Sequence, residues 1–398
     1  MAIRELGHLL SEGVRGDRVF VRADLNVPLD GGEVADSTRL SASLPTLQRL
    51  LEAGARVVVA SHLGRPKGQR VPELSLRPVA SRLAQLLGTG VSFCEDCVGD
   101  LARAAIDELG EGQLLVLENL RFHAAEEQND PDFAKALASL VDVYINDAFG
   151  TAHRAHASTV GMVASVPRVG AGELLASELE HLRVVLEPVR PLMVILGGAK
   201  VSDKLSVLEA LAPHADILAI GGAMAYTFMA AHGTAIGDSL VEPDRFEDAL
   251  AVERAAANAG RQLLLPTDHV VAARLSASAA YQVSNEIPGG QLGVDIGPET
   301  ARRYAEMAGL AKTIFWNGPM GVFEIEAFAE GTKTVATAVA AAEAVSVIGG
   351  GDSLAAINRL KLGDQIGHLS TGGGASLEYV QGLALPGVTV LEHALLEQ

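Results

Sequence analysis

The stretch Leu192-Met193-Val194-Ile195-Leu196-Gly197-Gly198-Ala199-Lys200 is the most informative part of this sequence for its fold. Five consecutive apolar residues are followed by two glycines and, one residue later, by a lysine. A continuous apolar run is typical of a strand covered on both faces, as strands of parallel sheets are. Glycine after such a strand permits a tight turn, and a turn that leads into a helix presents N–H groups to an anion. The stretch therefore predicts a buried parallel strand that ends in an anion-binding loop.

Other apolar, strand-like runs follow the same pattern, each ending in glycine or polar residues. They are 19–22, 56–60, 114–117 and 143–145 in the first half, and 217–220, 263–265, 313–315 and 345–348 in the second. Helical patterns lie between them, for example at 243–259 and 298–308. Strands that alternate with helices over 398 residues predict an α/β protein.

A break near the middle separates two halves, as expected because single cores stop growing near roughly 250–300 residues. Ser177-Glu178-Leu179-Glu180 matches a capping box, and Pro188 and Pro191 end the helix that it would start. We expect two doubly wound, Rossmann-like parallel-sheet domains joined by a hinge helix. The expected bounds are 1–172, 173–187 for the hinge, 188–380, and 381–398 for a C-terminal segment.

Composition excludes several classes of protein. The 31 Lys+Arg against 49 Asp+Glu give a net charge of −18, which argues against a general nucleic-acid binder. Residues 217–237 carry no formal charge but are interrupted by glycines, so we expect a strand and a packed helix there rather than a membrane span. The start of the chain lacks the apolar core of a signal peptide, and we expect a cytoplasmic protein.

The two cysteines, Cys94 and Cys97, form a single CxxC motif. A zinc finger needs four ligands, and no second pair of Cys or His stands at finger spacing. A redox role is the less favoured interpretation, and two cysteines in a chain of this length fit a reducing compartment.

Basic residues follow the predicted strands of the first half, although the protein is acidic overall. Because the carboxyl ends of parallel strands meet at one edge of a sheet, these side chains are expected to converge. Arginine offers a rigid fork suited to phosphate and carboxylate, so the set predicts a small anionic ligand. The residues are Arg22, Arg39, His62, Arg65, Arg121, His153, Arg154 and His156.

Glycine clusters follow the predicted strands of the second half, at 197–198, 221–222, 318–321, 349–351 and 372–374. Lys200 and Lys204 are spaced by one helical turn, so both ammonium groups are expected to reach one phosphate chain. Asp352 is placed to hold Mg²⁺ together with nucleotide phosphates. The P-loop pattern GxxxxGK[ST] is absent, and no GxGxxG follows a strand, which weakens a dinucleotide-dehydrogenase interpretation.

Taken together, these motifs resemble the phosphoglycerate kinase family along essentially the whole chain. The matching strings are Val21-Arg22-Ala23-Asp24-Leu25-Asn26-Val27-Pro28, 61–66, Asn119-Leu120-Arg121-Phe122 and 147–156 in the first half, and 196–204, 316–324, 349–353 and 368–376 in the second. The resemblance implies reversible phosphoryl transfer between 1,3-bisphosphoglycerate with MgADP and 3-phosphoglycerate with MgATP, a step of glycolysis.

The resemblance also assigns roles to individual residues. It implies a triose-ligand site of Asp24, Asn26, Arg39, His62, Gly64, Arg65, Arg121 and Arg154. It implies a nucleotide site of Lys204, Asn317, Glu324, Gly350, Gly351, Asp352 and Ser353, in which Glu324 binds the ribose hydroxyls and Asp352 binds the Mg²⁺ ion. The catalytic residues would be Arg39, Lys200, Lys204 and Gly373.

Further expectations follow from the same resemblance. The two ligands would sit on different domains and meet by hinge closure, and the chain's end would pack on the first domain. His62, His153 and His156 would bind or support rather than shuttle protons, because a carboxylate acceptor has no proton to lose. A monomer is expected, with no nucleic-acid or membrane partner.

Two alternatives remain open at this level. A different small-molecule kinase acting on a carboxylate or phosphosugar would share the glycine and lysine half without requiring the arginine set. A non-catalytic hinge-bending protein for anionic metabolites would leave Lys200, Lys204 and Asp352 without a purpose.

Overall fold

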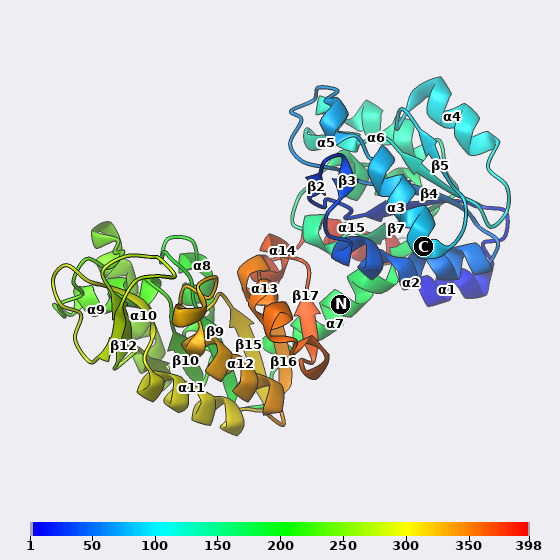
Figure 1. Cartoon of the computed structure of the whole chain (residues 1–398). Coiled ribbons are helices and arrows are strands. Elements are labelled where there is room, and N and C mark those ends of the chain that lie inside the picture. Colours follow the sequence, from blue (N-terminus) through cyan, green and yellow to red (C-terminus); the bar gives the residue numbers. More distant parts are fainter. Residues whose placement is uncertain (1–2, 397–398) are drawn as a thin grey trace. The chain divides into compact units, whose positions relative to one another are not determined.

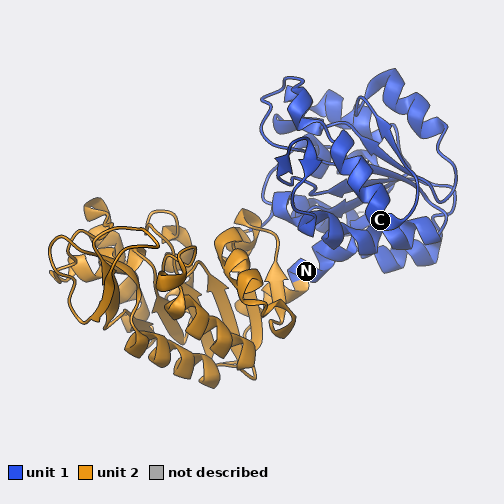
Figure 2. Cartoon of the chain, in the orientation of Figure 1, with its two compact units in different colours: residues 1–179, 384–398 blue, residues 180–383 orange. Residues whose placement is uncertain are grey.

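The computed structural model describes residues 3–396, and the chain divides into two compact units (Figures 1 and 2). Unit 1 holds residues 1–179 together with 384–398, and unit 2 holds residues 180–383. The division falls within helix α7 (Glu173–Leu186).

Unit 1 is built on a sheet whose strands all run parallel. The central strand β1 (Arg18–Ala23) lies between β4 (Arg56–Ala60) and β7 (Val143–Asp147), and Val21 pairs with Val59 on one side and Ile145 on the other. Helices cover both faces of this sheet, so the middle residues of its central strands are apolar, and polar residues come near the strand ends. Within the described residues the full order is β5 (Val91–Cys94), β6 (Leu114–Leu117), β4, β1, β7 and β8 (Arg168–Ala171).

The helices of unit 1 include one from the end of the chain. α15 (Pro386–Leu396) contacts β8 and the turns 157–165, and Gly387 N–H donates to Ala152 O at 2.9 Å. The others are α1 (Leu6–Glu12), α2 (Thr38–Glu52), α3 (Arg77–Leu87), α4 (Gly99–Asp107), α5 (Ala124–Glu127) and α6 (Pro131–Ala138).

Unit 2 repeats the parallel architecture. Its strand order in the described chain is β11 (Gln262–Leu264), β10 (Ile217–Ile220), β9 (Leu192–Leu196), β15 (Thr313–Asn317), β16 (Val345–Gly349) and β17 (His368–Ser370). The chain moves outward from β9 to β11 and then returns to β15 on the other side of β9. The switch point, where ligands bind in such sheets, therefore lies between β9 and β15.

Seven helices of the described part of unit 2 accompany this sheet, and α11 lies along α12 (Figure 1). They are α8 (Leu205–Leu211), α9 (Met224–Ala231), α10 (Phe246–Asn258), α11 (Pro298–Leu310), α12 (Glu330–Ala341), α13 (Gly351–Leu360) and α14 (Gly374–Val380).

Two small antiparallel elements were not predicted. In unit 2, β12 (His269–Ala272) pairs with β13 (Tyr281–Ser284) and β14 (Leu292–Ile296). In unit 1, β2 (Leu29–Asp30) pairs with β3 (Glu33–Val34).

The predicted α/β class with two parallel sheets is confirmed, and all nine predicted strands are present with ends within two residues. The parallel strands that were missed, β5, β8 and β17, all lie at sheet edges. An edge strand has a partner on one side only, so it does not require the continuous apolar run on which the prediction relied.

The predicted start of the connecting helix at Ser177 is wrong, because α7 begins at Glu173. Its first turn is capped from distant parts of the chain. Thr46 Oγ1 accepts from the N–H of Glu173 at 2.8 Å, and Asp147 Oδ1 accepts from the N–H of Leu174 at 2.9 Å. The motif at 177–180 therefore lies inside α7, where the backbone N–H groups already donate to carbonyls of the preceding turn and need no cap.

The uncharged stretch 217–237 forms β10, a glycine turn and α9, as expected. Among residues 3–396, no helix combines the length and the apolar character that crossing a membrane requires.

Candidate active site

Arg22 lies at the carboxyl end of β1 and is fully buried. Its Nε donates to Ser158 Oγ at 2.8 Å, and its Nη2 is 3.4 Å from His62 Nδ1. Ser158 donates in turn, through its N–H at 2.9 Å and through its hydroxyl, to the buried carboxylate of Glu126. Burial raises the pKa of Glu126, while the nearby Arg22 charge opposes that rise. Ser158 and Glu126, which support this guanidinium, were not predicted from the sequence.

Asp24 and Arg39 form an ion pair next to this group. Arg39 Nη1 donates to Asp24 Oδ2 at 2.6 Å. The other carboxylate oxygen, Asp24 Oδ1, is buried without a hydrogen-bond partner among the described residues and lies 3.9 Å from His62 Nδ1. Arg39 stands in the first turn of α2.

The turn at Gly64 joins Asn26 and Arg121. Asn26 Oδ1 accepts from the N–H of Gly64 at 2.9 Å, and Arg121 Nη1 donates to Gly64 O at 2.9 Å. Gly64 has φ +62°, and an added Cβ would lie 2.7 Å from a methyl of Leu74, so glycine is required here. Within the described chain, Arg121 Nη2 is buried and lacks a hydrogen-bond partner.

Two histidines at this edge of the sheet have lowered pKa values, because they are buried among positively charged side chains. Burial lowers the pKa of His62 well below its ordinary value, and four arginine charges lower it further. Burial also lowers the pKa of His156 to about 4. Both imidazoles are therefore neutral near pH 7. The arginines that act on His62 are Arg22, Arg121, Arg154 and Arg39, so four of the predicted basic residues lie near this one imidazole.

Two of the predicted residues, Arg154 and Arg65, make at most one side-chain hydrogen bond in the described part of the chain. Arg154 Nε donates to His153 Nε2 at 3.1 Å. Arg65 is exposed and makes no hydrogen bond within the described residues, so the structure does not bring it into the buried cluster.

In unit 2 the strand-end loops pack backbone against backbone. A Cβ on Gly197 would lie 2.0 Å from Pro319 O, and one on Gly222 would lie 2.4 Å from Gly198 O. Gly222 also has φ +67°. The glycines that follow β9, β10 and β15 are thus needed for loops that touch without side chains between them.

A cavity of about 260 Å³ lies at this edge and contains most of the predicted nucleotide residues. Lys204 Nζ donates to Asn317 Oδ1, and burial lowers the pKa of Lys204. Asn317 Nδ2 is buried and without a hydrogen-bond partner in the described part of the chain. The predicted residues that line this cavity are Lys200, Lys204, Asn317, Gly350, Gly351, Asp352 and Ser353.

The helical spacing assumed for Lys200 and Lys204 is wrong. Both precede α8, which begins at Leu205. Glu242 accepts from the N–H of Ser202 at 3.0 Å and from its hydroxyl at 2.6 Å, and so holds this segment as a turn. The two lysines nevertheless line the same cavity.

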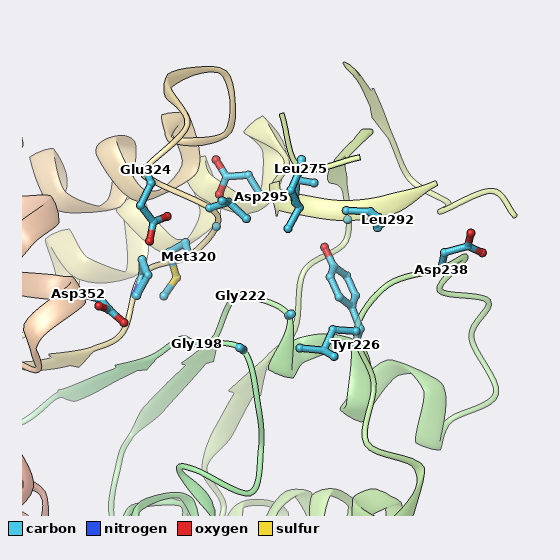
Figure 3. A pocket seen from close by; sticks show the side chains of 18 residues that line it. Gly198, Gly222, Tyr226, Asp238, Leu275, Leu292, Asp295, Met320, Glu324 and Asp352 are labelled. Atoms are coloured by element: carbon cyan, nitrogen blue, oxygen red, sulfur yellow. The ribbon is translucent and has the colours of Figure 1, made fainter. Parts of the chain in front are cut away.

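A second, more apolar cavity of about 450 Å³ adjoins the first, and both are lined by Gly198, Ala199, Pro319 and Asp352. Figure 3 shows Glu324 and Asp352 on one side of it, and Leu275, Leu292 and Tyr226 on the other. Glu324 was predicted, but the apolar wall was not. Leu275 is 58% exposed although it lines the cavity, which is typical of a ligand pocket.

Gly373 is the N-cap residue of α14 and has φ +56°. It lines neither of the two cavities found among the described residues.

Comparisons with known proteins agree with this geometry. The family model described as phosphoglycerate kinase matches residues 10–383. The phosphoglycerate kinase of Moorella thermoacetica is 54% identical over 377 residues, which cover 94% of this chain and 96% of that one. The phosphoglycerate kinase of Acaryochloris marina is 49% identical over 401 residues and covers 99% and 100%.

Solved structures are also similar. Phosphoglycerate kinase from Coxiella burnetii superposes with a TM-score of 0.90 at 40% identity, covering 98% of this chain and 99% of that one. The enzyme from Pyrococcus horikoshii superposes with a TM-score of 0.84 at 33% identity and covers the whole of both chains. The chain therefore belongs to the phosphoglycerate kinase family, glycolytic phosphotransferases that use a carboxyl group as acceptor.

Proposed function

We propose that this chain catalyses reversible phosphoryl transfer between 1,3-bisphosphoglycerate with MgADP and 3-phosphoglycerate with MgATP. The observation that carries the proposal is the set of buried polar atoms left without partners among the described residues at the two strand edges. These include Asp24 Oδ1 and Arg121 Nη2 in unit 1, and Asn317 Nδ2 in unit 2. Buried polar atoms are rarely left unsatisfied, and a ligand that supplied a hydroxyl and phosphates would satisfy all three.

In this proposal the triose ligand binds at the edge of unit 1. Asp24 would accept from its hydroxyl group, and the arginine forks would bind its phosphate and carboxylate. Neutral His62 would offer a hydrogen bond without adding charge, which its lowered pKa supports. The proposed residues are Asp24, Asn26, Arg39, His62, Gly64, Arg65, Arg121 and Arg154.

The nucleotide would occupy the two adjoining cavities of unit 2. The apolar cavity suits a base, and the glycine-lined cavity suits phosphates, with Glu324 at the ribose hydroxyls. The residues proposed for the phosphates are Lys200, Lys204, Asn317, Gly350, Gly351 and Ser353. Backbone N–H groups at the start of α13 favour anions there.

Asp352 fits the role of a Mg²⁺ ligand. Its carboxylate is exposed and lines both cavities, and Mg²⁺ is usually held by one or two carboxylates together with substrate phosphates. When bound, the ion would neutralise charge on the nucleotide phosphates.

Transfer to or from a carboxylate needs positioning and charge stabilisation, with no general base. Arg39 from unit 1 and Lys200 from unit 2 would stabilise the charge on the transferred group, with Lys204 on the nucleotide phosphates and Gly373 contributing its backbone. Because these groups belong to different units, we propose hinge bending at 173–187 to bring them together and to exclude water. We further propose that the protein acts as a monomer in the cytoplasm.

The test is turnover of 3-phosphoglycerate with MgATP, coupled to oxidation of NADH by a dehydrogenase that reduces the product. Turnover is expected to require both ligands and Mg²⁺, and to fall at least about hundredfold in Arg39→Ala and in Lys200→Ala. Calorimetry is expected to show that Arg39→Ala still binds nucleotide and that Lys200→Ala still binds the triose. Lys333→Ala, which removes an exposed lysine paired with Glu330, is the matched control. Nucleotide binding without transfer would reject the proposed acceptor.

A further inference from the structure

The Cys94–Cys97 motif takes no part in the proposed phosphoryl transfer. Cys94 ends β5, and Cys97 lies in the loop that follows. Both cysteines are free thiols, and Cys97 is only 1% exposed. The sequence shows no further metal-ligand pair at the spacing of a zinc finger, but the fold brings other ligand residues close to Cys97.

The partner comes from the neighbouring strand. β5 pairs with β6 in parallel, with Cys94 opposite Leu117, so the loops after the two strands leave the sheet side by side. The loop after β6 carries His123, whose Nε2 lies 2.7 Å from Asp96 Oδ1. The ligand atoms of Asp96, Cys97 and His123 all lie within 4.8 Å of one another. Topology thus assembles a carboxylate, a thiol and an imidazole.

The chemistry of these three groups suits a divalent transition ion. Zinc takes sulfur, nitrogen and oxygen ligands, and three protein ligands with a water in the fourth position are a common arrangement. One thiolate and one carboxylate would balance the two positive charges of the ion. Asp96 and His123 have partly exposed side chains, at 26% and 32%, so an ion would reach the buried sulfur from their side.

The surroundings orient the group for such a role. Arg70 lies 3.6 Å from Asp96 Oδ2 and donates to Glu95 O at 2.8 Å. Arg70 thus lies on the side of Oδ2, whereas Oδ1 accepts from the N–H of Cys97 at 2.7 Å and faces His123 Nε2. Support of a ligating carboxylate by a second group is a regular feature of metal sites.

We propose that Asp96 Oδ1, Cys97 Sγ and His123 Nε2 form a site for a divalent transition ion of the zinc class. The ion would replace the hydrogen bond between Asp96 and His123. The imidazole would then carry its proton on Nδ1 instead of Nε2, and the Cys97 thiol proton would leave to solvent. Cys94 stands outside this ligand set. Because His123 follows Arg121 by two residues, a bound ion would tie the loop after β5 to the turn that carries a proposed triose-binding arginine.

Cobalt is the probe that tests this site, because Co²⁺ bound to a thiolate has a near-ultraviolet charge-transfer band that histidine or carboxylate sites lack. The reduced full chain is titrated with Co²⁺, with neither nucleotide nor Mg²⁺ present. One equivalent is expected to produce the band. Cys97→Ser is expected to abolish it, and His123→Gln and Asp96→Asn are each expected to weaken binding about tenfold or more.

Matched controls separate the site from its neighbours. Cys94→Ser removes the other buried thiol, and Glu95→Gln removes the adjacent exposed carboxylate; both are expected to keep the band. Zn²⁺ is expected to raise the unfolding temperature of the wild type but not that of His123→Gln. The His123 side chain is partly exposed, so we expect the His123→Gln variant to fold.

Three results would overturn the proposal. They are the absence of a thiolate band in the wild type, a band of undiminished affinity in both His123→Gln and Asp96→Asn, and a band lost in Cys94→Ser but kept in Cys97→Ser. The first would mean that Asp96, Cys97 and His123 form a hydrogen-bonded cluster only.

Discussion

The two units present the groups that we propose for anion binding at equivalent sheet edges, but they use different parts of the chain. In unit 1 the groups are side chains, since Arg22, Arg39, Arg121 and Arg154 converge around a neutral His62. In unit 2 they are mainly backbone, since glycine loops after β9, β10 and β15 touch directly. Among the described residues, Lys200 and Lys204 are the positively charged side chains that line the cavity of about 260 Å³.

This difference teaches how one architecture can distinguish two ligands. Buried arginine forks fix the geometry of a small anion through directional hydrogen bonds, and they need braces such as Ser158 and Glu126. Glycine loops bind through N–H groups, which requires that the space beside the backbone stay empty. Side-chain replacements should therefore impair unit 1, and added methyl groups should impair unit 2.

The largest expected effect comes from adding one methyl group to unit 2. Gly222→Ala would place Cβ 2.4 Å from Gly198 O at a φ of +67°. Overpacking costs about 1–3 kcal/mol and the left-handed conformation about 1–2 kcal/mol, so nucleotide affinity should fall about hundredfold. Calorimetry with MgADP measures this loss, and 3-phosphoglycerate affinity should be unchanged.

Gly289→Ala is the control for this change, because nothing lies within 4 Å of the added Cβ and its φ is not positive. Equal nucleotide affinity in Gly222→Ala and Gly289→Ala would contradict the view that unit 2 recognises phosphate through backbone loops.

The next largest effect is expected when the two-armed guanidinium of Arg121 in unit 1 is replaced by a single ammonium group. Arg121→Lys keeps the charge but loses the bond to Gly64 O and the second arm at Nη2. Hydrogen bonds to charged groups contribute about 1.5–3 kcal/mol, so 3-phosphoglycerate affinity should fall roughly thirtyfold while nucleotide affinity is retained. Arg77→Lys, at an exposed arginine paired with Glu95, should bind both ligands as the wild type does. If Arg121→Lys matched that control, charge alone would account for binding in unit 1.

A further effect, on stability rather than on ligand affinity, concerns the carboxylate that caps α7. Burial raises the pKa of Asp147 to about 7 from an ordinary value of 3.8. Between these values the folded chain holds a proton that the unfolded chain releases, so stability falls as pH rises through this window, by at most about 1.4 kcal/mol per pH unit. Asp147→Asn cannot ionise but keeps an oxygen for the N–H of Leu174.

Urea unfolding between pH 4 and pH 8 measures this contribution. The stability of Asp147→Asn relative to the wild type should rise with pH and level off above about pH 7. Parallel profiles would show that Asp147 is ionised throughout and that its two backbone hydrogen bonds outweigh its burial.

Patterns in the sequence predicted the interiors of both sheets and most groups at their edges. Central strands are covered on both faces, so their apolar runs are continuous and easily recognised. The strands β5, β8 and β17 lie at edges and lack such a run, and the short strands β12–β14 of the added antiparallel sheet were also missed. The apolar wall formed by Leu275 and Leu292 was missed with that sheet.

Interactions between distant residues account for the other errors. Ser177 looked like a helix cap, but Asp147 and Thr46 cap α7 four residues earlier. Lys200 and Lys204 looked helical, but the bonds from Ser202 to Glu242 hold a turn. A local pattern cannot contain a partner that lies 27 to 127 residues away, as these partners do.

The smallest expected effect separates the exposed arginine of unit 1 from the buried ones. Arg65 is exposed and makes no hydrogen bond within the described residues, so a ligand would have to order a long side chain that is now free. Exposed ion pairs contribute about 0.2–1 kcal/mol, so Arg65→Ala should weaken 3-phosphoglycerate binding by roughly fivefold or less. Raising the salt concentration should reduce the difference between Arg65→Ala and the wild type, because exposed charges are screened. A loss as large as that of Arg121→Lys, unaffected by salt, would instead mean that Arg65 becomes buried against the bound triose.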